Sequence, residues 1–82
     1  MENERLTRTY RINEEVFIFE MSPSDELPVI IKGRVVGVLS ENTIFKFRFQ
    51  ILSNGNLYFR HPIAIFKTLD EIRDCFNDMI IE

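Results

Sequence analysis

The chain contains one cysteine and one histidine, Cys75 and His61, and these residue types suit nucleophilic catalysis. A Cys–His pair needs the two side chains in contact and a thiol activated by a helix N-terminus or a nearby cation. Cys75 follows Asp74 in the middle of a helical pattern, and nothing in the sequence brings His61 beside it. We therefore interpret Cys75 as a buried structural thiol and predict that the protein is not an enzyme.

Metal and cofactor chemistry lack the residues that they need. One histidine among scattered carboxylates falls short of a transition-metal site, and the sequence has no glycine-rich phosphate loop. A single cysteine also excludes an internal disulfide framework. We expect no catalytic residue, no metal and no cofactor, and a reducing compartment, the cytoplasm.

Binding chemistry is better represented, because charge is segregated along the chain. Residues 27–67 carry six basic residues and the single acid Glu41, whereas both ends are acidic. Alternation typical of strands places cations of this band beside an aromatic ring on one sheet face. Such a surface suits single-stranded nucleic acid, since stacking contributes about 1–3 kcal/mol per base. The predicted basic face comprises Lys32, Arg34, Lys46, Arg48, Phe59 and His61.

Two other interpretations of the basic face stay open. Lysine and arginine are ordinary on the solvent side of a half-exposed sheet. Alternatively, Phe59 with Val36 and Val38 packs against another layer or another subunit. The acidic ends of the chain repel phosphate, and the sequence has no signature of an RNA-binding fold.

Acidic side chains recur at helical spacing near the end of the chain. Three aspartates four residues apart stack like charges along one line of a helix. This face could offer a basic partner a phosphate-like surface, and a solvated face is the alternative. The predicted acidic face comprises Asp70, Glu71, Asp74 and Asp78.

Size and composition predict a single domain over residues 1–82. Hydrophobic residues make up 45% of the chain, which is a globular composition. The apolar stretches are far too short to span a membrane, and the charged start does not resemble a signal peptide. We expect no membrane partner.

Strands are expected between residues 6 and 66. Asn54-Gly55 is a strong hairpin signal, because a type I′ turn needs positive φ at both central positions. This turn pairs Ser53 with Asn56 and Ile51 with Tyr58. The residues 22–28 read as an irregular loop. Strands are predicted at 6–12, 16–21, 29–39, 44–52, 56–61 and 63–66.

A three-residue loop is expected between the strands 29–39 and 44–52. It pairs Ser40 with Ile44, places Leu39 with the phenylalanines, and keeps Lys32 and Arg34 on the basic side. A loop of even length would turn the first strand over, because side chains alternate between faces. We favour the odd loop, since it keeps charge out of the core.

The last segment predicts a helix over about 69–80, with Thr68 and Glu71 in a capping box. Strands followed by one helix predict an α+β fold. This fold is a small antiparallel sheet of four to six strands, with one C-terminal amphipathic helix packed on one face. We expect that face to carry the phenylalanines, with Phe47 against Phe76.

Two surfaces of opposite charge on a small domain favour docking on another protein. We predict a small non-enzymatic binding protein that acts as an adaptor or a virus-type inhibitor. The alternative is a single-stranded nucleic-acid-binding protein that uses the basic face. Apolar residues among the basic groups also predict a homodimer that buries Phe59 between subunits.

Overall fold

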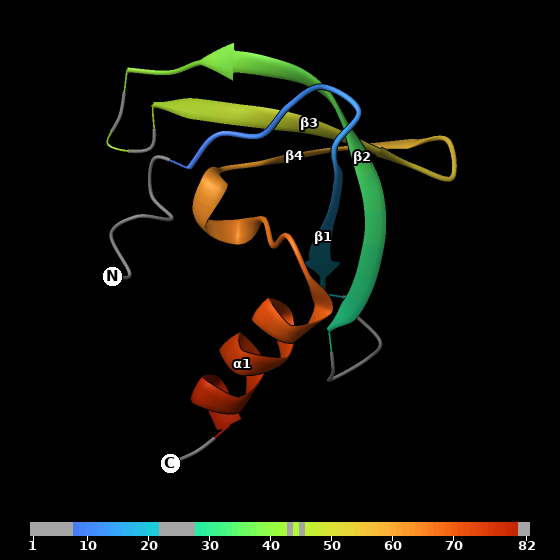
Figure 1. Cartoon of the computed structure of the whole chain (residues 1–82), viewed down its shortest axis with the longest axis vertical. Helices are drawn as coiled ribbons and strands as arrows, with labels where there is room; N and C mark the ends of the chain where they lie inside the picture. Colours follow the sequence, from blue (N-terminus) through green and yellow to red (C-terminus); the bar gives the residue numbers. More distant parts are fainter. Residues whose placement is uncertain (1–7, 22–27, 43, 45, 81–82) are drawn as a thin grey trace.

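The computed structural model confirms an α+β fold with one antiparallel sheet and one C-terminal helix (Figure 1). It describes residues 8–21, 28–42, 44 and 46–80, and for 76–80 the backbone alone. The strands follow one another in the sheet in the order β1-β2-β3-β4. The elements are β1 (Glu15–Glu20), β2 (Val29–Ser40), β3 (Phe47–Ser53), β4 (Asn56–Arg60), the 3₁₀ helix η2 (Pro62–Ala64) and α1 (Leu69–Ile80).

The hairpin between β3 and β4 has the predicted turn and register. Asn54 and Gly55 adopt φ of 52° and 79°, as a type I′ turn requires. Ser53 pairs with Asn56, and the ladder continues through Ile51 and Tyr58. Local turn chemistry thus determines the register of this half of the sheet.

Replacing Gly55 with alanine should lower the free energy of unfolding by about 1–2 kcal/mol, the cost of a left-handed L-residue. A Cβ at Gly55 would meet no atom within 4 Å, so the cost comes from the backbone alone. Urea denaturation measures the change. Asn54→Gly is the control, because glycine adopts positive φ freely; equal stability of the Gly55→Ala protein would contradict the turn.

The register between β2 and β3 differs from the one predicted. Ser40 pairs with Phe47 and not with Ile44, because the connection extends from Glu41 to Lys46. The amide of Glu41 donates to the carbonyl of Lys46 at 2.7 Å, and Lys46 has φ of 68°. The alternation of side chains gives no sign that Lys46 adopts a positive φ. The predicted strand 44–52 therefore begins earlier in the chain than β3 does.

A β-bulge between Val35 and Gly37 further shifts the pairing of these strands. On one side of it Val35 lies opposite Ile51, and on the other side Leu39 lies opposite Arg48. Leu39 therefore joins the basic side, whereas the sequence placed it with the phenylalanines. The prediction for Arg34 is confirmed, because it lies opposite Leu52 on the face away from Ile51.

The N-terminal segment is wrongly predicted as a strand where the structure describes it. Residues 8–12 are irregular, and they insert Tyr10 into the core with 5% of its surface exposed. The Tyr10 hydroxyl donates to the carbonyl of Ile65 at 3.0 Å, and its ring meets that of Phe49 edge-on at 5.2 Å. Leu6 and Thr7 lie outside the described residues, as does most of the predicted loop 22–28.

The segment after β4 also departs from the predicted edge strand. Pro62 begins a 3₁₀ helix, because proline at its first position fixes φ and lacks an amide donor. Only Phe66 pairs with the sheet, through two backbone hydrogen bonds of 2.7 and 2.9 Å to Phe17 of β1. This bridge covers part of the outer edge of β1.

The main core lies between the concave face of the sheet and the segments that cover it. Tyr10 and Ile65 supply the cover, and Phe47 packs against this cluster while remaining partly exposed. The fully buried ring of the strand is Phe49, at 1% exposure. The cluster comprises Tyr10, Val16, Ile18, Val35, Phe49, Ile51 and Ile65.

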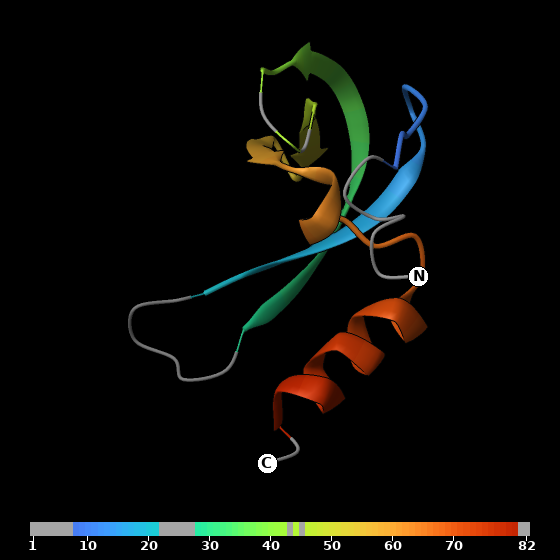
Figure 2. The ribbon, with the colours of Figure 1, turned by 90° about the vertical axis from the view of Figure 1, so that its left-hand side faces the viewer.

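The helix α1 lies on the side of β1 away from η2, as Figure 2 shows. Because neighbouring side chains of extended backbone alternate, Ile65 enters the main core while Phe66 faces the other way. The ring of Phe66 lies 6.1 Å from that of Phe19, and Ile72 of α1 is fully buried. The helix therefore does not lie on the predicted phenylalanine face, and the side chain of Phe76 is outside the described part of the chain.

Candidate functional site

Five apolar side chains lie exposed on the convex face of β2, β3 and β4. The ladder brings them together, because Leu52 pairs with Leu57, and Phe59 pairs with Gln50 beside the bulge at Val36. Each has between 37% and 49% of its surface exposed. We call this surface the outer patch; it comprises Val36, Leu39, Leu52, Leu57 and Phe59.

Two other exposed residues of β2, Val38 and Ile30, do not belong to the outer patch. Val38 follows the bulge and pairs with Phe49, so it belongs to the opposite face. Ile30 lies near the start of β2, where it pairs with Phe19 of β1. The outer patch is therefore confined to the half of the sheet that β3 and β4 complete.

The predicted basic face is largely occupied by ion pairs. Lys32 contacts Glu15 at 3.2 Å. Arg48 contacts Glu41 at 2.7 Å, and Nδ1 of His61 lies 3.5 Å from the same carboxylate. Glu15 lies on β1 and Glu41 in the β2–β3 connection, whereas Lys32 and Arg48 lie on β2 and β3. The alternation pattern along β2 and β3 therefore did not reveal these ion pairs.

Arg34 and Lys46 are the two predicted cations that make no ion pair with a described residue. Arg34 lies beside Leu52 of the outer patch. Lys46 is in the β2–β3 connection and not on the sheet. The structure therefore brings Arg34, Arg48 and Phe59 to one face and leaves Lys46 off it.

The predicted acidic face of α1 is divided. Asp70 is exposed and contacts Arg73 at 3.5 Å, one turn along the helix, while Asp74 is exposed. Glu71 instead turns toward the N-terminal segment, where both of its oxygens accept hydrogen bonds from Arg8 at 3.2 and 3.3 Å. The side chain of Asp78 lies outside the described residues.

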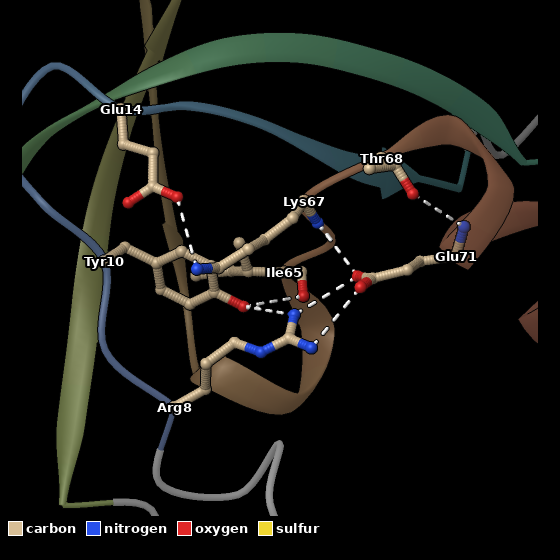
Figure 3. A network of polar contacts seen from close by, with 7 residues as sticks. All are labelled: Arg8, Tyr10, Glu14, Ile65, Lys67, Thr68 and Glu71. Atoms are coloured by element: carbon tan, nitrogen blue, oxygen red, sulfur yellow. Dashed lines mark hydrogen bonds and ion pairs between the residues drawn. The ribbon is translucent and has the colours of Figure 1, made fainter.

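A polar network joins the N-terminal segment to the start of α1 (Figure 3). Arg8 bonds both Glu71 and the hydroxyl of Tyr10, and the amide of Lys67 donates to Glu71 at 2.9 Å. Burial lowers the pKa of Arg8, but the hydrogen bonds to Glu71 and Tyr10 outweigh it and raise the pKa. One half of the predicted capping box is present, since the amide of Glu71 donates to the hydroxyl of Thr68 at 3.2 Å.

The sequence does not predict this network, because more than fifty residues separate its N-terminal members from Ile65, Lys67 and Glu71. The alternating pattern places Arg8 and Tyr10 in a strand, and helical spacing places Glu71 on the acidic face and in the capping box. The buried hydroxyl of Tyr10 also requires a hydrogen-bond partner, which Ile65 supplies. The arrangement holds the N-terminal segment on the core.

The described residues line at least two hollows. One hollow has a volume of about 720 Å³ and is lined by residues 9–14 and Lys67. Within this lining, Lys67 and Glu14 form an ion pair of 3.5 Å. A second hollow, of about 190 Å³, opens beside the outer patch between Arg34 and the β3–β4 turn. Among the described residues, no group of three His, Cys, Asp or Glu could hold a metal ion.

No family model, curated protein or solved structure matches this chain significantly. The geometry of the chain itself must therefore carry any assignment of function. Within the part that the structure describes, no helix is long and apolar enough to cross a membrane. The surface feature that stands out is the outer patch, together with Arg34 at its border, which makes no ion pair with a described residue.

Proposed function

We propose that this protein acts by docking on another protein through the outer patch, as an adaptor or an inhibitor. The observation that carries the proposal is the exposure of five apolar side chains on three neighbouring strands. The largest apolar patch on the surface of a monomer is often a functional site. We keep the cytoplasm as the proposed location.

Phe59 is the natural anchor of such an interface. Aromatic side chains near the centre of an interface contribute most of the binding energy, while their neighbours exclude water. Phe59 lies on β4 with 41% of its surface exposed, and Leu57 lies two residues along the same face. The strand holds both side chains in place, which lowers the entropic cost of binding.

The nucleic-acid alternative is the weaker proposal. Lys32, Arg48 and His61 each face a carboxylate of the same chain, so a phosphate would have to compete with Glu15 and Glu41. The patch is also mostly aliphatic, whereas stacking on bases needs aromatic faces. Titration of labelled oligothymidine at low and high salt tests this alternative, because phosphate contacts give a steep salt dependence.

A second copy of the chain competes for the same surface. The homodimer expected from the sequence would bury Phe59, so it and the docked partner exclude each other. Light scattering over micromolar concentrations measures the mass of the protein. A dimer that Phe59→Ser dissociates would replace docking on a different protein as the role of the outer patch.

The double substitution Leu57→Ser/Phe59→Ser should abolish capture of the partner from a nuclease-treated lysate. Loss of a central aromatic anchor costs about 2 kcal/mol or more of binding free energy. The captured protein is then purified and titrated against each variant by calorimetry. The unfolding curve of the double variant should stay close to that of the unchanged protein, because both side chains are exposed.

The matched control is Ile12→Ser/Ile44→Ser. It removes two apolar side chains that are 54% and 69% exposed and that lie outside the sheet. This control should keep the partner at unchanged affinity. Equal affinity of both double variants for the purified partner would show that the outer patch is not the docking surface.

A further inference from the structure

The smaller hollow forms a defined border of the outer patch. Leu52 belongs to both, and Arg34 lies directly opposite Leu52 across the β2–β3 ladder. On its other side Arg34 lies opposite Glu15 of β1. The hollow is lined by Glu15, Lys32, Gly33, Arg34, Leu52, Ser53 and Asn54.

Arg34 differs from the other arginines of the sheet. Arg48 contacts Glu41, and Arg60 contacts Glu20 and also donates to the carbonyl of Phe19 at 3.3 Å. Arg34 makes no hydrogen bond or ion pair through its side chain with any described residue. A guanidinium presents five donors in a planar fork that matches a carboxylate, and no described residue supplies one to Arg34.

The charge of the hollow favours an anionic occupant. Its carboxylate, Glu15, lies 3.2 Å from Lys32, so that pair is satisfied internally. Arg34 then leaves the lining with one positive charge in excess. The outer patch next to it supplies apolar surface, and excluding water from that side strengthens an ion pair made by Arg34.

The walls of the hollow are held in place before any ligand arrives. The hydroxyl of Ser53 donates to the carbonyl of Lys32 at 2.8 Å and ties β3 to β2. Gly33 allows a close approach of the strands, since a Cβ there would meet Cγ2 of Ile51 at 2.7 Å and the carbonyl oxygen of Leu52 at 2.9 Å. A rigid site loses little conformational entropy on binding.

We propose that this hollow seats a carboxylate of the docked protein, from an Asp or Glu that is flanked by apolar residues. The carboxylate bonds the guanidinium of Arg34, and the flanking residues pack on Leu52, Leu57 and Phe59. This assignment rests on the proposed docking function and specifies the chemistry of the partner as an acidic segment with apolar anchors.

Charge complementarity selects this occupant over two others. A second copy docked face to face would oppose its own Arg34 to the same positive surface. A nucleic-acid strand would set its bases against the aliphatic side chains of Leu52 and Leu57, whereas base stacking needs aromatic faces. An acidic segment with apolar anchors pairs its carboxylate with Arg34 and covers the apolar side chains of the outer patch.

A random peptide library displayed on phage tests the proposal with the unchanged protein as bait. Enriched peptides should carry Asp or Glu next to Leu, Ile or Phe. One of them is then synthesised with and without an Asp/Glu→Asn/Gln change, and its affinity is measured by fluorescence anisotropy. The amide version should bind about tenfold or more weakly, since a charge-assisted hydrogen bond is lost.

Protein variants locate the carboxylate. Arg34→Glu should weaken the acidic peptide about tenfold or more, whereas Glu15→Gln should tighten it by removing the competing charge. Lys46→Glu makes the same charge change at an unpaired cation away from the hollow and should leave the affinity nearly unchanged. Circular dichroism checks that each variant is folded, which the exposure of Arg34 and Lys46 favours.

Enrichment of basic or neutral peptides, no enrichment at all, or equal affinity for Arg34→Glu would each overturn the carboxylate site. Competition by oligothymidine that depends on Arg34 would reassign the hollow to phosphate. The failure of docking itself is distinguishable: there the Leu57→Ser/Phe59→Ser protein keeps its lysate partner. If that protein loses the partner while Arg34→Glu keeps it, docking stands and the carboxylate site falls.

Discussion

Replacing Phe49 with alanine should lower the free energy of unfolding by about 3–5 kcal/mol. Phe49 is 1% exposed, and its ring meets Tyr10 edge-on at 5.2 Å, so truncation leaves a cavity that two covering segments cannot easily close. A domain of this length has a total stability of roughly 4–12 kcal/mol. We therefore expect a large unfolded population, measured by urea denaturation followed by circular dichroism.

Phe59→Ala is the matched control, because it removes the same ring from the outer patch. Its ring is 41% exposed, and the substitution should cost far less than that of Phe49. Phe47→Ala should fall between the two, since Phe47 packs against the core while remaining partly exposed. Equal midpoints for Phe49→Ala and Phe59→Ala would mean that the two faces of the sheet are reversed.

The parts of the fold that short-range signals determine were predictable from the sequence. Asn54-Gly55 determines the turn and the β3–β4 register through backbone preference alone. Thr68 and Glu71 mark the start of α1 through a local hydrogen bond. Each signal acts over a few residues, so no knowledge of the rest of the chain is needed.

The bulge at Val36 and the positive φ at Lys46 were not predictable in this way. Neither residue type favours its conformation, so tertiary packing must stabilise it. The same holds for the segment around Tyr10, where an alternating pattern resembles a strand but the ring is needed as a lid on the core. An alternating pattern in the sequence indicates which side chains are buried. It does not show whether the buried side chain belongs to a strand or to an irregular segment.

The candidate site, like the fold, could be predicted from the sequence only in part. The alternation of side chains along β2, β3 and β4 correctly placed Arg34 and Phe59 on one face of the sheet. It could not show that Arg48 would meet Glu41 while Arg34 would stay unpaired, because ion pairing depends on loop geometry. The feature on which the proposed carboxylate site depends, a guanidinium of the sheet that pairs with no described residue, is therefore visible only in three dimensions.

Replacing Ile72 with alanine should release α1 from the sheet. An isolated helix of this length is marginal in water, so its stability must come from tertiary packing. Ile72 is fully buried, on the side of β1 where Phe66 lies near Phe19. Truncation should cost about 2–5 kcal/mol, and amide hydrogen exchange followed by mass spectrometry should show loss of protection in α1.

Because α1 lies outside the main core, the loss of amide protection after Ile72→Ala should be confined to α1. The amides of β2 and β3 should stay protected after Ile72→Ala, because the cluster around Phe49 does not include Ile72. Leu69→Ala is the control, since Leu69 is 40% exposed in the same helix and its truncation should leave exchange in α1 nearly unchanged. If Ile72→Ala instead exposed β2, β3 and α1 together, the helix would be part of one cooperative core, and its placement on the far side of β1 would not describe how the domain is stabilised.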